Sequence, residues 1–300
     1  MLSPPVARRR VARSLRDMRR QAGLTLELAA SKLDLARSGL HRLESGISVA
    51  NVHVARSMMD LYDQYAPDLL DMIRAARRRG WWQDYRVPNR DYLGWEAGAA
   101  AVHEVAVVRL PELLQTEVYA RELLAGRDEL IDEIKTRRIR QQRLDDSDRP
   151  LAFTVVLDEA ALRNCVGEPS VMRRQLAHVI ECGDRANVRV RVLPSSTGAR
   201  VRTAGFRLLE FDHPDDSPVM FADCVHATVR EDGSERVAET RQVFEAVASA
   251  ALSEEDSIAF IRDLSRELYP SARPTTAGSF SVQNRSFGGL SRSSSLVNTK

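Results

Sequence analysis

The chain has 300 residues, of which 43% are hydrophobic and 29% charged. This length allows about two domains of about 150 residues each, and the composition excludes collagen-like, disulfide-stapled and mostly disordered chains. The net charge is only +2, but residues 1–80 carry 15 basic and 8 acidic side chains, whereas residues 81–270 carry 25 and 34. This segregation predicts a basic binding module joined to an acidic module with a different role.

The three cysteines, Cys165, Cys182 and Cys224, leave one unpaired in any disulfide scheme, and none lies within four residues of another. This pattern argues against a zinc site and favours a reducing, cytoplasmic compartment. No run of about 18 apolar residues is present, so we expect no membrane span. We also expect no cofactor and no bound metal.

Apolar residues at helical spacing predict an all-α N-terminal domain over residues 1–79. Gly23 is expected to end its first helix, Thr25 to cap the second, and Gly46 to end the third. The expected helices span residues 6–21, 26–33, 36–45, 52–65 and 67–79.

Residues 80–98 contain all three tryptophans and show little periodicity. We interpret them as a connector that docks through its aromatic side chains, because aromatic residues in a linker more often fasten domains together than stack on a ligand.

Residues 99–270 mix helical and strand-like patterns, which predicts a second domain of the α+β class. Three strands, 205–212, 218–225 and 226–232, follow one another as an antiparallel meander. The other expected strands are 151–158 and 188–194, and the expected helices are 97–107, 117–125, 128–144, 159–166, 171–184, 235–252 and 255–268. Residues 271–300 are rich in Ser and are expected to be disordered.

The stretch from Gly23 to Gly46 carries the clearest chemistry. Small and apolar residues stand where the two helices of a helix-turn-helix cross, at Ala29, Ala30, Leu33, Leu35, Leu40 and Leu43. The other side of the second helix carries Arg37, Ser38, His41 and Arg42. Such a helix fits the DNA major groove, where Arg can hydrogen-bond guanine O6 and N7 and Ser can hydrogen-bond several different bases.

This stretch resembles the helix-turn-helix of XRE-type regulators, which have the phage-repressor-like fold. The matching residues are Gly23, Leu24, Thr25, Ala30, Leu33, Leu40, Leu43, Glu44 and Gly46. The resemblance implies that Arg37, Ser38 and Arg42 read bases, and phosphate contact is the alternative for these residues. We expect Thr25, His41 and Ser45 to support DNA binding, with capping as the alternative for His41. It also implies an ion pair between Arg19 and Glu44.

Three residues depart from the XRE pattern. Leu26 replaces a glutamine that contacts phosphate, Asp34 replaces the turn glycine, and Ala36 replaces a polar N-cap. We expect weaker phosphate anchoring from the first departure. An aspartate tolerates the left-handed turn, and the missing cap costs about 1 kcal/mol of local stability.

The remainder of the chain resembles a group of actinobacterial, antitoxin-like regulators whose second domain has no known function. The resemblance rests on residues 80–82, 113–120, 138–141, 158–163, 175–176 and 192–194 before Gly198. Pro111-Glu112 departs from the Pro-Gly of that pattern. Members are often encoded beside a small partner protein.

Several residues allow a structural and a functional interpretation. Arg8, Arg9, Arg10 and Arg13 either reach phosphates or lie exposed on their helix. Residues 113–120 and 158–163 either contact an effector or serve the structure, by helix packing in the first segment and by an Asp158 cap in the second. The structural role is favoured.

Two further clusters are weak candidates for chemistry. Cys224 and His226, with Asp223, are the only trace of a nucleophile arrangement, and no further orienting group is evident, so we expect no enzyme. His213 lies beside Asp212, Asp215 and Asp216, where a polar turn explains it better than a metal site.

These observations predict a sequence-specific transcriptional regulator, a repressor or antitoxin-like protein that binds a double-stranded DNA operator as a homodimer. Two recognition helices would lie about 34 Å apart, and the acidic domain would bind a small effector or a partner protein. The alternative is an antitoxin that neutralises a small partner protein and only autoregulates through DNA.

Overall fold

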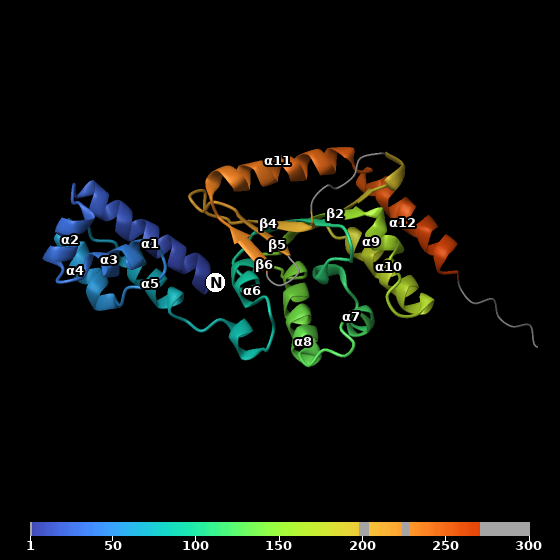
Figure 1. Ribbon diagram of the computed structural model, residues 1–300, viewed down its shortest axis with the longest axis horizontal. Helices are drawn as coiled ribbons and strands as arrows, with labels where there is room; N and C mark the ends of the chain where they lie inside the picture. The colour runs from blue at the N-terminus through green and yellow to red at the C-terminus, as the bar shows by residue number, and fades with distance from the viewer. Residues whose placement is uncertain (1, 198–203, 224–227, 271–300) are drawn as a thin grey trace, which may run out of the picture. The chain divides into compact units, whose positions relative to one another are not determined.

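The computed structural model describes residues 2–197, 204–223 and 228–270. The predicted α+β class is confirmed: a helical N-terminal region precedes a mixed sheet with helices on both faces (Figure 1). The first five helices are α1 Pro4–Gln21, α2 Leu26–Lys32, α3 Arg37–Glu44, α4 Val52–Tyr62 and α5 Pro67–Ala76. Their order agrees with the expected ranges, with ends that differ by a few residues.

A separate apolar core holds the helical region, which we call the head, together. Helix α1 contributes Val11, Leu15 and Met18, spaced so that they lie on one face. They pack against Leu40 of α3 and Ile73 of α5, both fully buried. The head is therefore built around α1, whose opposite face remains available for other contacts.

The remaining chain forms a six-stranded sheet and the helices that cover it. The strands are β1 Ala101–Ala106, β2 Ala152–Asp158, β3 Val188–Leu193, β4 Phe206–Glu210, β5 Val219–Asp223 and β6 Thr228–Glu231. The α-helices are α6 Arg90–Glu96, α7 Glu117–Leu123, α8 Leu130–Gln141, α9 Glu159–Arg163, α10 Pro169–Gly183, α11 Ser234–Ala250 and α12 Glu254–Leu268. Short 3-10 helices span Trp81–Asp84, Glu112–Leu114, Gln142–Leu144 and Ser195–Thr197.

The strand order is β3-β2-β1-β4-β5-β6. β1, β2 and β3 run parallel, β4 pairs antiparallel with β1, and β4, β5 and β6 form the predicted antiparallel meander. The sheet domain is therefore mixed, with a parallel half and an antiparallel half.

The expectation of a helix over residues 97–107 is wrong. Residues 101–106 form β1, near the middle of the sheet between β2 and β4. Val102 and Val105 are both buried but belong to different clusters on the two faces of the sheet. The alternation of period two therefore prevailed over the helix preference of the alanines, and it places Glu104 on the same face as Val102.

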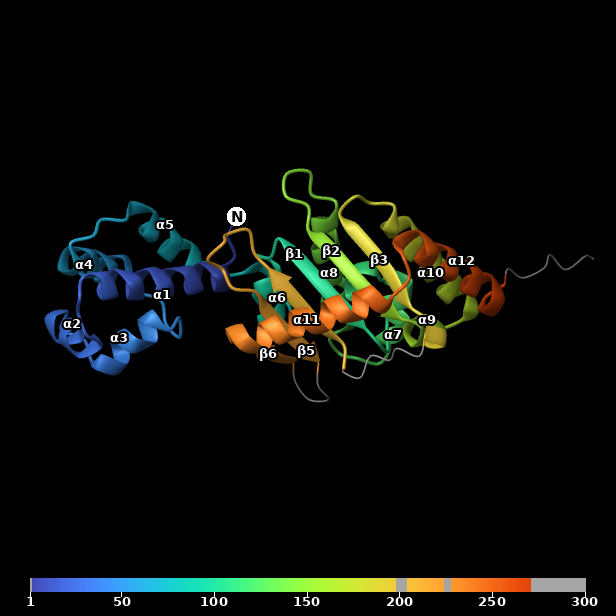
Figure 2. The ribbon, with the colours of Figure 1, turned by 90° about the horizontal axis from the view of Figure 1, so that it is seen from above.

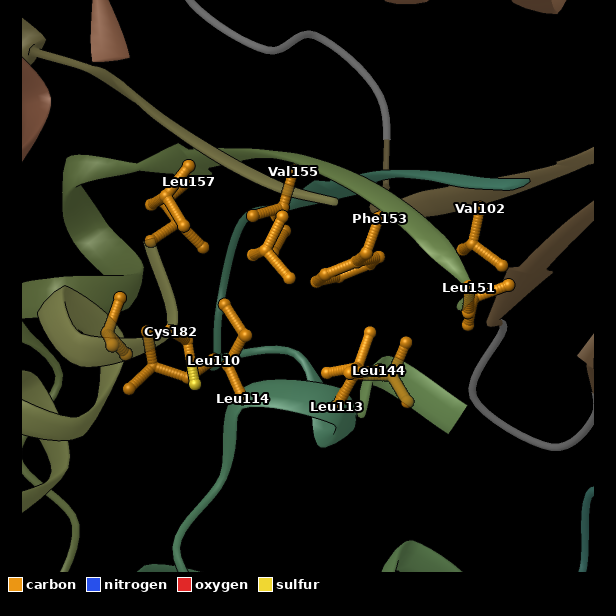
Figure 3. Close-up of a cluster of buried hydrophobic side chains, with 14 of the residues drawn as sticks. Val102, Leu110, Leu113, Leu114, Leu144, Leu151, Phe153, Val155, Leu157 and Cys182 are labelled. Atoms are coloured by element: carbon orange, nitrogen blue, oxygen red, sulfur yellow. The ribbon is translucent and has the colours of Figure 1, made fainter. Parts of the chain in front are cut away.

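The main core lies between one face of the sheet and the elements beneath it (Figure 3). Phe153, Val155 and Leu157 of β2 point toward Leu110 and Leu113, which come from the chain that follows β1. The other face is covered by α11, which crosses the sheet in both ribbon views (Figures 1 and 2) and contributes Phe244.

The Trp-containing segment belongs to the main core. Trp82 and Trp95 are each 5% exposed, so the prediction that this segment docks through its aromatic residues is confirmed. Residues 90–96, expected as irregular connector, form α6. The first residues of α1 also contact this core through Val6.

Candidate nucleic-acid interface

Helices α2 and α3 are joined by a tight turn over residues 33–36. Asp34 adopts a positive φ of 53°, as expected for the residue that replaces the turn glycine. The Leu35 amide donates to the Ala30 carbonyl at 2.9 Å. Ala29, Ala30 and Leu40 are almost fully buried, so small side chains let the two helices approach closely.

The first turn of α2 has a side-chain cap and the first turn of α3 has none. The Thr25 hydroxyl accepts from the Leu28 amide at 3.2 Å, which confirms Thr25 as the N-cap of α2. Ala36 precedes α3 and provides no side-chain cap. The unsatisfied amides at the start of α3 therefore remain available to solvent or to an anion.

Arg19 of α1 ties three parts of the head together. Its guanidinium donates to both oxygens of Glu44, at 2.7 and 2.8 Å, and to the Leu24 carbonyl at 2.7 Å. Glu44 is only 5% exposed, and its hydrogen bond raises the pKa of Arg19 above the usual range. The pair implied by the XRE resemblance is thus present and holds the end of α3 against α1.

The side of α3 opposite Leu40 is open to solvent. Arg37, Ser38, His41 and Arg42 are all exposed, and so are Thr25 and Ser45. The Ser45 hydroxyl donates to the His41 carbonyl at 2.7 Å and so satisfies the C-terminus of α3. Within the described residues, the Arg42 side chain has no hydrogen bond or ion pair.

Arg37 is engaged by Glu27 of α2 across the turn. The Arg37 Nε donates to Glu27 Oε1, although the two side chains are 66% and 61% exposed. This hydrogen bond lowers the pKa of Glu27. Sequence reasoning missed Glu27; its position in the first turn of α2, beside the start of α3, was the available signal. In the free protein this pair therefore occupies the Arg37 guanidinium.

Most of the basic arm contacts the sheet domain. Arg10 Nε donates to Asp216 Oδ2 at 2.6 Å, and Arg13 Nη2 lies 3.3 Å from Asp216 Oδ1. The Arg9 guanidinium stacks on the rings of Trp95 and Phe211. The expectation of plain exposure is therefore wrong for these three arginines, and of the four only Arg8 is exposed. Phosphate contact by the arm stays a prediction.

The second-domain motifs serve packing and capping. Leu113, Leu114, Tyr119 and Ala120 are buried. Asp158 Oδ1 accepts from the Ala160 amide at 2.9 Å as the N-cap of α9. The structural interpretation of both motifs is therefore confirmed.

The structure describes only part of the first weak candidate cluster, Asp223, Cys224 and His226, and all of the second, around His213. Cys224 and His226 lie outside the described residues, whereas Asp223 is bonded to Arg207 and to the Thr228 hydroxyl. His213 lies in a turn, where its carbonyl accepts from the Asp216 amide at 2.9 Å. Within the part of the chain that the structure describes, no group of three or more potential ligands is arranged to hold a metal ion.

A network of buried ion pairs beneath the sheet was not foreseen. Arg140 donates to both oxygens of Glu96 at 2.7 Å and also to Glu112. Arg137 bonds Glu112 at 3.0 Å and Glu133 at 3.1 Å. Burial raises the pKa of Glu112, but the two arginines outweigh it, and the pKa of this carboxyl lies well below its usual range.

A buried brace, a tight turn and an open, cationic second helix together define a helix-turn-helix module of the DNA-binding type. In agreement, a family model described as a helix-turn-helix domain matches residues 10–72. A second family model, described as a domain of unknown function (DUF5753), matches residues 89–263, more than half of the chain. The chain therefore belongs to the DUF5753 family.

No curated protein and no solved structure matches this chain. Among the described residues, no helix is both long and apolar enough to cross a membrane.

Proposed function

We propose that this protein is a sequence-specific transcriptional regulator, a repressor of the actinobacterial antitoxin-like XRE group, that reads the major groove of its operator with α3. The observation that carries this proposal is the open face of α3, where Arg37, Ser38 and Arg42 are exposed on a helix whose C-terminal end is held against α1 by the Arg19–Glu44 pair. Arginine hydrogen-bonds guanine O6 and N7, and serine can hydrogen-bond several different bases.

Charge supports a division of labour between the two parts of the chain. Residues 1–80 carry an excess of basic side chains and residues 81–270 an excess of acidic ones, so phosphates are attracted to the head and repelled elsewhere. The proposed division places the DNA-binding domain at residues 1–79, the connector at 80–98 and the effector or partner domain at 99–270. The same domain would supply the contacts of a homodimer.

Selection from a pool of random double-stranded DNA tests this proposal with the full-length protein. A homodimer should enrich near-palindromic sites whose half-sites lie about one helical turn apart. The triple variant R37A/S38A/R42A should enrich no sequence, whereas R77A, which removes an exposed arginine at the end of α5, should enrich the same sites. Absence of enrichment by the wild-type protein would refute sequence-specific binding.

A second candidate is an antitoxin that neutralises a small partner protein and uses DNA binding only for autoregulation. The edge strand β6 favours it, because β6 ends the strand order and its Val229 is 48% exposed. Such an edge offers backbone groups for an added strand. Copurification of a protein encoded by a neighbouring gene tests this role. Loss of that copurification in V229K would support it, and an unchanged yield of the partner with V229K would exclude β6 as its binding site.

A further inference from the structure

A cavity of about 560 Å³ opens at one end of β1, β4 and β5. This volume lies in the range of small-molecule pockets. Its described lining includes Glu104, Arg109, Leu110, Glu112, Arg207 and Asp223. Apolar and charged groups thus share one wall, as they do in sites that bind and orient a ligand.

Two of the three carboxylates that line the cavity are already satisfied. Glu112 is bonded to Arg137 and Arg140. Asp223 accepts from Arg207 and from the Thr228 hydroxyl, the latter at 3.0 Å. Neither carboxylate therefore needs a further donor.

Glu104 is the exception. Its side chain is 13% exposed and its nearest cation, Arg207 Nε, lies 3.6 Å away, beyond a good hydrogen bond. Within the described residues, no donor reaches hydrogen-bond distance of its carboxyl group. Within the described residues, the Glu104 carboxyl group therefore has room for a hydrogen-bond donor that enters the cavity.

The arginines of the wall are poorly placed to hold an anion instead. Arg207 is bonded to Asp223 and stacks on the Tyr92 ring at 4.6 Å, and its Nη1 is enclosed rather than open to the cavity. Arg109 lies 4.0 Å from Asp223. The Arg109 side chain is 47% exposed and is therefore solvated. Among the described lining groups, Glu104 differs from Arg109 in being only 13% exposed, and from Arg207 in having no hydrogen bond.

We propose that this cavity binds a small organic cation, a protonated amine on an apolar body, which donates a hydrogen bond to Glu104. The buried side chains of Leu110 and Phe206 would contact the apolar body. The interpretation of this cavity as an effector site rests on the proposed regulatory function of the protein. Amine binding itself is measured without DNA. Failure of the amine site and failure of operator recognition are thus distinguishable.

Calorimetric titration of the full-length protein tests the site with three amines of increasing size, benzylamine, phenethylamine and tryptamine. The neutral 2-phenylethanol and the anionic phenylacetate are the matched probes. At pH 8 at least one amine should bind at least tenfold more tightly than 2-phenylethanol and phenylacetate. Equal binding of amine and alcohol, preferential binding of the anion, or no binding of any amine would overturn the proposal.

The variant E104Q keeps the shape of the side chain and removes its charge. It should lose the amine preference by at least tenfold, while E235Q, which changes an exposed carboxylate at the start of α11, should bind as the wild type does. Far-UV circular dichroism and urea unfolding show whether E104Q folds. A folded E104Q with unchanged amine affinity would overturn the assignment.

The pH dependence gives an independent readout. Burial raises the pKa of Glu104 to about 7, although Arg207 lowers it. The other groups that face it are Tyr92, Glu112, Arg140 and Asp223. Because the carboxylate form accepts the amine, affinity should rise about tenfold from pH 6 to pH 8 in the wild type. It should stay flat in E104Q, and a flat wild-type profile would contradict a role for Glu104.

Discussion

Arginine is used in opposite ways in the two regions of this chain. On α3 of the head, Arg37 and Arg42 extend into solvent, and only Arg37 has an exposed carboxylate partner. Beneath the sheet, Arg137 and Arg140 are buried and each contacts two glutamates. The near-zero net charge therefore averages cations available to a partner and cations neutralised inside the fold.

The largest effect is expected from breaking the buried network. R140M leaves Glu96, which is 1% exposed, without its bidentate partner. Loss of one member of a buried pair costs about 3–5 kcal/mol, and urea unfolding of the full chain measures it. R121A removes an exposed pair with Glu117 and should cost less than about 1 kcal/mol. Equal costs for the two variants would show that burial does not distinguish these arginines.

The next effect concerns the pH dependence of stability. The pKa of Glu104 in the folded protein is about 7, above its ordinary value of 4.5. The folded state therefore holds a proton that the unfolded state releases between these values, and stability falls as the pH rises through this window. The loss is on the order of 2–3 kcal/mol by pH 8. Denaturant unfolding of the wild type and E104Q at pH 5 and pH 8 measures this fall in stability. E104Q should not show it, and an equal fall in both proteins would contradict the raised pKa of Glu104.

The junction between α1 and the sheet domain is expected to contribute less. Asp216 has a fully buried side chain that contacts Arg9, Arg10 and Arg13. D216A should destabilise the protein by about 2 kcal/mol through lost charged hydrogen bonds. D215A, whose side chain is 68% exposed, is the control, and its unfolding midpoint should barely move. A D216A midpoint equal to the D215A midpoint would argue that the junction carries no stability.

The smallest effect is expected at Glu27. E27Q breaks an exposed ion pair worth less than about 1 kcal/mol and frees Arg37, so operator affinity should rise slightly, by no more than about threefold. E239Q, on the exposed part of α11, should leave affinity unchanged. Weaker operator binding by E27Q would mean that Glu27 positions Arg37 for its contact.

The head was predictable because its signals are local. Thr25 caps α2, Asp34 takes the left-handed turn, and Gly46 follows α3 with a positive φ of 73°. Each of these residue types favours its turn or cap through the conformation of its own backbone and immediate neighbours. Helical spacing then placed Leu40 inward and Arg42 outward, so the candidate interface followed from the same pattern.

The sheet domain was less predictable because its signals depend on distant partners. The alanines around residue 100 favour a helix, and pairing with both β2 and β4 makes this stretch a strand. Arg137 and Arg140 lie on a charge-rich helix that reads as solvated, yet their glutamate partners come partly from α6 and from the turn after β1. Neither the network nor the position of Glu104 in the cavity wall is visible without the fold.

The central claim, that α3 reads base edges, is tested most directly by R42A on operator DNA and on scrambled DNA of equal length at fixed salt. R42A should lose about 1–3 kcal/mol of affinity for the operator and less for scrambled DNA, while R77A should weaken both equally or not at all. Equal losses by R42A on the two DNAs would contradict the account and make Arg42 a phosphate contact.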